Sequence, residues 1–212
     1  MKIAVIGAGQ VGGTLGNAWQ RRGHDISYGV PDPRGSKYAS LGAAATTNAE
    51  AARAAEVVVL CTPWHGTRDA LQACGDLAGK TLIDCTNPLT SDFAALTVGH
   101  TTSGAEQVAL WAPGARVCKA MNQIGAPMMD APALSGAPVM FVCGDDDGAK
   151  KSTIGLVGEL GFDAVDAGEL TAARLLEPFG LLWIHLALRR GFGTSWGFGI
   201  LREAGASGKR LA

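Results

Sequence analysis

The sequence predicts an α/β protein built on a doubly wound parallel sheet, with a small C-terminal helical extension. Three observations support this fold class. Short apolar runs alternate with helical stretches along most of the chain, as they do where right-handed crossovers join parallel strands. The first apolar run leads into a glycine-rich turn and then a helix. The 212 residues, 47% of them hydrophobic, suffice for one sizeable core.

Each element is expected from its local pattern. Lys2–Ile6 is a β-branched apolar run that ends before a glycine, as buried parallel strands do. Val11–Arg22 carries apolar residues at helical spacing and stops before Gly23. The same criteria predict later strands at Asp25–Val30, Glu56–Thr62, Thr81–Cys85, Arg116–Ala120, Val139–Cys143 and Phe162–Asp166. They predict helices at Thr47–Ala55, Asp145–Leu160 and Leu170–Arg190, the last interrupted by Pro178.

Three glycines after the first strand form the most informative motif. Gly7, Gly9 and Gly12 have the spacing G-x-G-x-x-G between a predicted strand and a predicted helix, which is the context of the Rossmann-type dinucleotide fingerprint. Gly7 permits the tight turn, Gly9 lets the backbone approach a pyrophosphate, and Gly12 lets helix and strand pack closely. The amides of Gln10 and Val11 would then point at the phosphates. A plain strand, turn and helix without a ligand is the alternative interpretation.

The end of the second strand bears on which nicotinamide cofactor is bound. NAD-binding proteins usually place a carboxylate there to hold the ribose diol, whereas this strand ends in Val30 and Pro31, with Asp25 at its opposite end. The following loop offers donors that suit the 2′-phosphate of NADP(H), namely Arg34, Ser36 and Lys37. NADP(H) is therefore favoured. A solvated loop, or Asp32 holding the ribose of NAD, is the alternative.

These elements predict two units, an NADP-binding Rossmann domain at residues 1–167 and a C-terminal helical segment at residues 168–212. The apolar run within Phe179–Leu188 is much shorter than the roughly 20 residues that span a bilayer, so we expect no membrane insertion. The chain begins Met-Lys and passes directly into the first strand, which leaves no room for an export signal. We therefore expect a cytoplasmic protein.

Composition favours a small-molecule partner. Eighteen basic and nineteen acidic residues give a net charge of −1, which provides no field to attract nucleic acid or an anionic membrane. Three consecutive acids, Asp145–Asp147, are expected to cap a helix, and we predict no metal site. The cysteines are too widely spaced for a metal-binding pair or an evident disulfide framework, and we expect them to be reduced core thiols. They are Cys61, Cys74, Cys85, Cys118 and Cys143.

Ligands of doubly wound sheets lie beyond the carboxyl ends of the strands. Three predicted strand ends meet there, namely Cys61–His65, Cys85–Leu89 and Cys118–Asn122. Six motifs follow one another along the chain: GAGQVGGTLG, TPW, DCTNPL, KAMN, VCGDDDGAKK and FDAVDAGELTAARLLEP. In these motifs and their order the chain resembles the deazaflavin (coenzyme F420)-dependent NADP oxidoreductases over nearly its whole length. It is also similar to the cytosolic oxidoreductase domain of the STEAP metalloreductases.

The resemblance implies direct hydride transfer between NADPH and a flavin or deazaflavin ring, a small-molecule acceptor. Such a transfer depends on positioning more than on acid–base groups, so we predict no catalytic side chain. The residues expected along the nicotinamide and its acceptor are Thr62, Pro63, Trp64, Asn87, Pro88, Ala120 and Asn122. We also expect a homodimer, with the C-terminal helical segment over the acceptor pocket. One position departs from the family, which commonly has Arg where this chain has Pro31.

Two other functions remain open on the sequence alone. A nonenzymatic NADP(H) sensor would bind the cofactor without turnover. A dehydrogenase of small imines or hydroxy acids would need a proton donor beside the nicotinamide, for which His65 and Lys119 are the candidates. The other histidines, His24, His100 and His185, are expected to be structural. Trp183 is expected to pack in the core or in a dimer interface.

Overall fold

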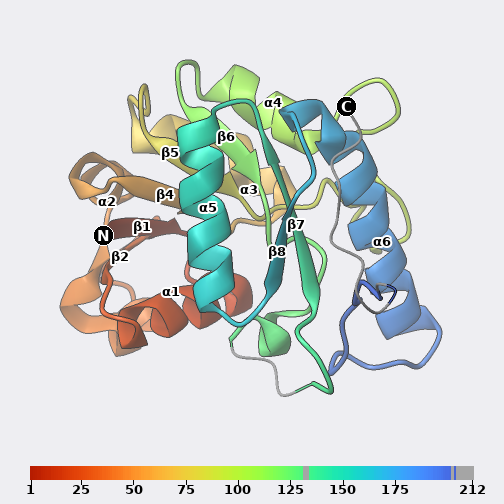
Figure 1. Ribbon diagram of the computed structural model, residues 1–212. Helices are drawn as coiled ribbons and strands as arrows, with labels where there is room; N and C mark the ends of the chain where they lie inside the picture. The colour runs from red at the N-terminus through yellow and green to blue at the C-terminus, as the bar shows by residue number, and fades with distance from the viewer. Residues whose placement is uncertain (131–133, 202, 204–212) are drawn as a thin grey trace.

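An eight-stranded sheet forms the centre of the computed structural model, which describes residues 1–130, 134–201 and 203. The strand order is β3-β2-β1-β4-β5-β6-β7-β8 (Figure 1). The strands are β1 Lys2–Ile6, β2 Asp25–Gly29, β3 Ala45–Thr46, β4 Val57–Leu60, β5 Thr81–Asp84, β6 Arg116–Lys119, β7 Val139–Gly144 and β8 Asp163–Asp166. The order reverses between β1 and β4, which places a ligand-binding crevice at the carboxyl ends of these two strands.

Helices cover both faces of the sheet and bury two separate apolar clusters. They are α1 Gln10–Arg21, α2 Asn48–Ala54, α3 Trp64–Cys74, α4 Gly104–Trp111, α5 Asp147–Glu159 and α6 Ala173–Arg189. Within β1, Ile3 and Val5 pack toward α1 and α5, whereas Ala4 and Ile6 pack toward α2, α3, α4 and α6. This alternation follows from the two-residue period of a strand. Burying apolar side chains on both faces is what makes β1 a continuous apolar run.

The predicted fold class is confirmed, and every predicted strand is present within two residues at each end. The aspartate cap is also present, because Asp146 Oδ1 accepts a hydrogen bond of 2.8 Å from Ala149 N at the start of α5. Helices α3 and α4 were not expected from the sequence. The loop after β2 contains a further unexpected element, the 3₁₀ segment η1 Ser36–Ala44, which leads into the short edge strand β3.

One strand departs from the predicted parallel arrangement. Strand β7 runs antiparallel to β6, with Cys118 opposite Gly144 and Lys119 opposite Cys143. The reason lies in the connection between the two strands, where the regular structure among the described residues is a three-residue 3₁₀ turn, η2 Ala126–Met128. A parallel neighbour needs a crossover of a dozen or more residues, usually helical, whereas a looped return allows antiparallel pairing.

Helix α6 continues through Pro178, where the sequence predicted an interruption. A proline inside a helix removes one hydrogen bond and normally kinks it. Here the two preceding residues are held against the sheet, since Asn122 Nδ2 donates to Leu176 O at 3.0 Å and Glu177 is bonded to the start of α4. Pro178 itself faces solvent, so its ring meets no packed neighbour on the buried side. None of the described helices is both long and apolar enough to cross a bilayer.

A buried charge cluster joins the ends of β5 and β6 to helices α4 and α6. Lys119 Nζ lies 2.8 Å from Asp84 Oδ2 and 3.0 Å from Glu177 Oε1, and all three side chains are almost fully buried. Glu177 also accepts hydrogen bonds from the backbone amides of Gly104 and Ala105 at the N-terminus of α4. Burial alone would lower the pKa of Lys119, but the two carboxylates raise it above its ordinary value. Lys119 is therefore charged, and its ammonium is bound by the two carboxylates of the cluster.

We expect Lys119→Met to lower the free energy of unfolding by about 3–5 kcal/mol, because it leaves two buried carboxylates without their cation. Urea denaturation followed by circular dichroism measures the change. Lys151→Met is the matched control, since Lys151 is an exposed lysine on α5 and should change stability by no more than about 0.5 kcal/mol. Equal stability of the two variants would contradict the structural role assigned to the cluster.

Candidate functional site

The glycine turn after β1 is shaped by close backbone approaches. Gly7 has φ +96°, and a Cβ there would lie 3.0 Å from the carbonyl oxygen of Cys61 at the end of β4. A Cβ on Gly12 would lie 1.9 Å from the carbonyl oxygen of Gly7, so helix α1 can sit on the turn only if this residue is glycine. A Cβ on Gly9 would meet nothing within 4 Å. Gly9 thus borders open space, which is the cradle that a pyrophosphate requires.

The N-terminus of α1 presents unpaired amides to that space. Gly9 is the N-cap residue, and it has no side chain to accept from the first turn of the helix. The first turn also contains no acidic residue. The amides of Gln10 and Val11 therefore lack a side-chain partner at the positive end of the helix dipole, a combination that favours an anion. This local geometry fits the pyrophosphate that the sequence predicted there.

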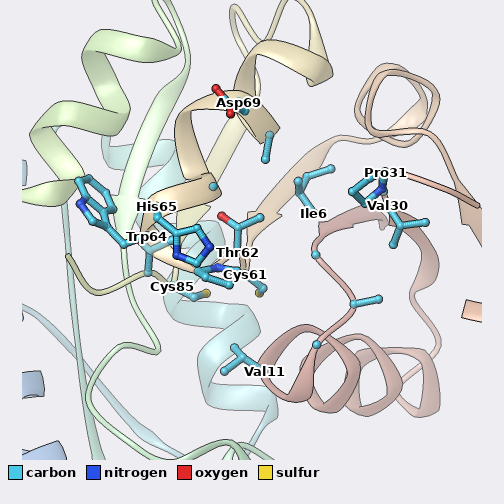
Figure 2. Close-up of a pocket in the computed structure, with 18 of the residues that line it drawn as sticks. Ile6, Val11, Val30, Pro31, Cys61, Thr62, Trp64, His65, Asp69 and Cys85 are labelled. Carbon is cyan, nitrogen blue, oxygen red and sulfur yellow. The ribbon is translucent and has the colours of Figure 1, made fainter. Parts of the chain in front are cut away.

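A cavity of about 1170 Å³ extends from this turn across the carboxyl ends of β1, β2, β4 and β5. Its volume exceeds the roughly 300–1,000 Å³ of common small-molecule pockets. Figure 2 shows Val30 and Pro31 at one end of the cavity, Ile6 near the middle, and Cys61, Thr62, His65 and Cys85 at the other end. The cavity is therefore elongated, with the glycine turn between two chemically different ends.

At the first end, the structure separates the residues predicted to hold a 2′-phosphate. Lys37 lines the cavity together with Val30 and Pro31, and its ammonium lies 5.3 Å from the centroid of the Tyr38 ring. Arg34 and Ser36 belong to the same loop but lie outside the cavity lining. The side chain of Asp32, the alternative ribose ligand, accepts from the backbone amide of Arg34 at 3.3 Å. Their part in cofactor binding remains a prediction.

At the second end, Thr62, Pro63, Trp64 and Asn87 line the cavity. Their contact with a nicotinamide stays a prediction. The Trp64 ring packs on that of Trp111 in α4, with centroids 5.3 Å apart. This tilted ring contact joins the first turn of α3 to α4. Thr62 also contacts α3, because its hydroxyl lies 3.0 Å from that of Thr67.

Pro88, Ala120 and Asn122 lie outside the cavity lining. Ala120 is fully buried, and Asn122 is 4% exposed. Asn122 nevertheless acts on the site through its neighbour, because its Nδ2 donates to Asn87 Oδ1 at 3.0 Å and its carbonyl accepts from Asn87 Nδ2 at 2.9 Å. This reciprocal pair fixes the Asn87 amide at the cavity wall.

The two candidate proton donors differ sharply. Lys119 is fully buried and bound to Asp84, Glu177 and the Thr86 carbonyl, so it does not reach the cavity. His65 is exposed and lines the cavity in the first turn of α3. Within the described part of the chain, His65 is thus the histidine at this end of the site.

The structure adds lining residues that the sequence did not single out. Tyr38 and Thr47 border the first end, and Leu89 with Phe93 borders the second. Phe93 lies in a tight loop where Leu89 and Leu96 form an antiparallel bridge, and it adopts φ +58° while 51% of its surface is exposed. The available signal for Phe93 was an aromatic residue four positions after the predicted strand-end segment Cys85–Leu89. Tyr38 was hidden in a loop predicted only as irregular.

Comparison with known proteins identifies the family. The family model described as "NADP oxidoreductase coenzyme F420-dependent" matches residues 2–88. A crystal structure from Arthrobacter sp. FB24, provisionally described as an F420-dependent NADP-reductase, has a TM-score of 0.86 and 32% identity, with 95% of this chain and 100% of that chain covered. The F420-dependent NADP reductase of Methanothermobacter marburgensis is 29% identical over 89% of this chain and 93% of its own length.

Two further similarities carry less functional information. Metalloreductase STEAP3 of Rattus norvegicus is 28% identical over 85% of this chain, but this chain spans only 36% of that protein. Reductive aminases and imine reductases share the architecture at 18–23% identity, with TM-scores of 0.64–0.66. At that identity the likeness shows the fold alone.

Substitutions at two glycines of the turn should have different effects, one on cofactor binding and the other on stability. We expect Gly9→Val to abolish dinucleotide binding without loss of the fold, because its side chain would enter open space and its backbone is extended. We expect Gly12→Val to destabilise the protein by about 3 kcal/mol, the upper range for overpacking, because its Cβ meets the Gly7 carbonyl. Thermal unfolding and fluorescence titration with NADPH test both variants. Wild-type NADPH affinity in Gly9→Val would refute the placement of the pyrophosphate.

Proposed function

The chain belongs to the family of coenzyme F420-dependent NADP oxidoreductases, and from this premise we propose that it transfers a hydride between NADPH and a deazaflavin or related flavin-type ring. The observation that carries the proposal is the continuity of one elongated cavity. It runs from the glycine turn to an end bordered by Leu89 and Phe93. A site for a dinucleotide alone would not need this apolar border beyond Asn87.

The residues present fit a bound NADP(H) in one direction. Lys37 and Val30 would hold the adenosine end, and the amides of Gln10 and Val11 would hold the pyrophosphate. Thr62 and Asn87 would border the nicotinamide, with Asn87 fixed by its pairing to Asn122. When bound, the cofactor supplies the hydride. The protein supplies a fixed position for each end of the cofactor, which lowers the barrier through orientation.

The acceptor end favours a flat, largely apolar ring. Leu89 and the exposed face of Phe93 offer apolar surface, and Ser91 between them offers a hydroxyl group. The loop is stiffened internally, since Thr90 N donates to Ala95 O at 2.9 Å and Thr97 N donates to Pro88 O at 2.7 Å. A stiff apolar wall can hold a ring against the nicotinamide and exclude water. This arrangement supports a flavin-type acceptor more than a small polar ketone.

One observation favours a second function. His65 lines the cavity at the nicotinamide end, where a dehydrogenase of small imines or hydroxy acids would need a proton donor. The alternative candidate for that role, Lys119, is excluded because the buried charge cluster occupies it. The effect of removing the His65 imidazole on turnover therefore distinguishes a flavin-type reductase from a dehydrogenase of small imines or hydroxy acids. Absence of any turnover with bound NADPH would instead support a nonenzymatic sensor.

The proposal makes a prediction about cofactor choice. The double variant Arg34→Ala, Lys37→Ala should lose about 2–4 kcal/mol of NADPH binding, because each charge-assisted hydrogen bond contributes roughly 1.5–3 kcal/mol. Binding of NADH should barely change, since it lacks the 2′-phosphate. Because Lys37 lines the cavity and Arg34 does not, Lys37→Ala alone should account for most of the loss.

Dissociation constants for both cofactors, measured by fluorescence titration, test this prediction. Arg68→Ala is the matched control, as Arg68 is exposed on α3 and lies outside the cavity lining. Equal losses of NADPH and NADH affinity in the double variant would show that the loop does not distinguish the cofactors.

The hydride step itself yields a further prediction. Stopped-flow mixing of NADPH-loaded protein with F420, FMN, FAD, quinones and small imines should give rapid oxidation with a deazaflavin or flavin. In single turnover with that acceptor, His65→Ala should retain a rate within about tenfold of wild type, or about 1.4 kcal/mol of barrier. C4-deuterated NADPH identifies the hydride step. A thousandfold loss in His65→Ala with unchanged NADPH affinity would replace the proposal by an acid–base dehydrogenase.

A further inference from the structure

Two cysteines stand side by side at the floor of the cavity. Cys61 and Cys85 each follow the last residue of a strand, β4 and β5, whose register pairs Leu60 with Asp84. The preceding residues on the same face, Val59 and Ile83, are paired in that register and pack in the same apolar cluster as the two cysteines. Both cysteines line the cavity, and Figure 2 labels both.

The spacing of these cysteines suits a disulfide. Neighbouring strands lie about 4.7–4.9 Å apart, which is within the roughly 4.4–6.8 Å between Cα atoms that a disulfide requires. A hydrogen bond of 3.1 Å from Cys85 N to Leu60 O holds the ends of the two strands together at this point. Because both cysteines lie beyond the regular ladder, their side chains can approach without breaking it. The two thiols are close enough to interact, since the Cys61 thiol raises the pKa of Cys85.

The other cysteines provide a structural contrast. Cys118 and Cys143 also lie on neighbouring strands, yet Cys118 contacts Thr153 of α5 while Cys143 Sγ donates to the Leu170 carbonyl on the opposite face. Burial raises the pKa of Cys118 to about 11 and that of Cys143 to about 12. Cys74 is buried in α3, where it bonds to the Ala70 carbonyl. These three thiols fit the inert core role that the sequence predicted for all five.

We propose that Cys61 and Cys85 form a redox-active dithiol, which hydroperoxides convert to an intramolecular disulfide when the cavity is empty. This goes beyond the hydride transfer proposed above, and formation of the disulfide does not depend on it. Cys61 is half-buried and reaches the cavity, whereas Cys85 is 7% exposed. Contact with the Cys61 sulfur and burial raise the pKa of Cys85, so its proton is retained and Cys61 is the sulfur that reacts first.

The chemistry balances with the peroxide as oxidant. The Cys61 sulfur attacks one peroxide oxygen and the O–O bond breaks. The attacked oxygen stays on sulfur as a sulfenic acid, and the thiol proton of Cys61 passes to the leaving oxygen, which departs as an alcohol, or as water from hydrogen peroxide. The Cys85 sulfur then attacks the sulfenic sulfur. The S–S bond forms, and the hydroxyl group leaves as water with the Cys85 proton. In total the two thiols lose two hydrogens, and one peroxide is reduced.

The backbone of Cys61 lies against the glycine turn. A Cβ on Gly7 would lie 3.0 Å from the carbonyl oxygen of Cys61, so backbone and turn are in close contact. A shift of Cys61 toward Cys85 therefore alters the floor on which the dinucleotide would rest. Coupling between two sites is reciprocal. If the disulfide weakens cofactor binding, a bound cofactor must oppose formation of the disulfide.

Peptide mapping tests the disulfide directly. The five cysteines fall on five separate tryptic peptides, so each pairing is unique: residues 54–68 hold Cys61, 69–80 Cys74, 81–116 Cys85, 117–119 Cys118 and 120–150 Cys143. The full-length, cofactor-free protein is treated with hydrogen peroxide, alkylated and digested. The expected product is peptide 54–68 linked to peptide 81–116, at a mass that has lost two hydrogens. The other three cysteines should remain alkylated.

Matched variants separate this pair from general oxidation. Cys61→Ser and Cys85→Ser should each abolish the link, whereas Cys74→Ser and Cys143→Ser should retain it. Thermal unfolding shows whether each variant is folded, and the wild-type peptide map stands without them. A link between other cysteines, a link between two protein molecules, or alkylated Cys61 and Cys85 after peroxide treatment would overturn the proposal.

A second arm tests the coupling to the cofactor. With NADPH at about 100 times its dissociation constant, only about 1% of the cavity is empty, and disulfide formation should slow by up to about 100-fold. Gly9→Val protein, which should not bind NADPH, should show no such protection. Unchanged oxidation of wild-type protein with bound NADPH would overturn the coupling. A failure of NADPH to bind at all would overturn the proposed function and leave the disulfide test in the empty protein intact.

Discussion

The buried ammonium of Lys119 between Asp84 and Glu177 is the interaction on which the nicotinamide end of the site depends. It connects the ends of two central strands to α6, a helix that is more than fifty residues away in sequence. The same lysine bonds the Thr86 carbonyl, and Asp84 Oδ1 accepts from Thr86 N and its hydroxyl. Residues 85–87, which border the cavity, are therefore held in place by the bonds of Asp84 and Lys119 to Thr86. Such a cluster is costly to bury, and its retention makes sense where it fixes a backbone that must not move.

The two halves of the cavity are built by different means. Around the glycine turn, shape comes from backbone alone, because no side chain fits at Gly12 and none is present at Gly9. At the nicotinamide end, shape comes from a chain of side-chain contacts that runs from Gln123 through Asn122 to Asn87. A turn shaped by its backbone can be recognised from a short glycine motif. The nicotinamide end depends on residues that meet only after the sheet has formed.

This difference explains how much the sequence could predict. All the strands except the short edge strand β3, the glycine turn and the aspartate cap of α5 follow from local patterns, and they are where the sequence placed them. Lys119 is the last residue of the site-facing strand β6 and was a candidate proton donor, but Glu177 from a distant helix binds its ammonium below the cavity. Asn122 was predicted beside the nicotinamide, which stays a prediction, and the structure shows that it bonds to Asn87, a contact that the sequence did not indicate. The proximity of Cys61 to Cys85 could not be predicted either. The two residues are far apart in sequence, and they become neighbours only because β4 and β5 pair with Leu60 opposite Asp84.

A site held in this way suits a reaction in which no proton is exchanged with the protein. Below the cavity floor, Lys119 and the amides at the N-terminus of α4 offset the charges of Asp84 and Glu177. The groups that reach the cavity include hydroxyls, an amide, thiols, the imidazole of His65 and apolar side chains. Most of these groups are uncharged, so we expect selectivity to come mainly from shape and stacking. The thiols are the exception, since they are the groups on this floor that can themselves be oxidised. In the proposals made here, occupancy of the cavity decides which chemistry is accessible. Hydride transfer would take place above the floor when the cofactor covers it, and thiol oxidation would take place within the floor when the cofactor is absent.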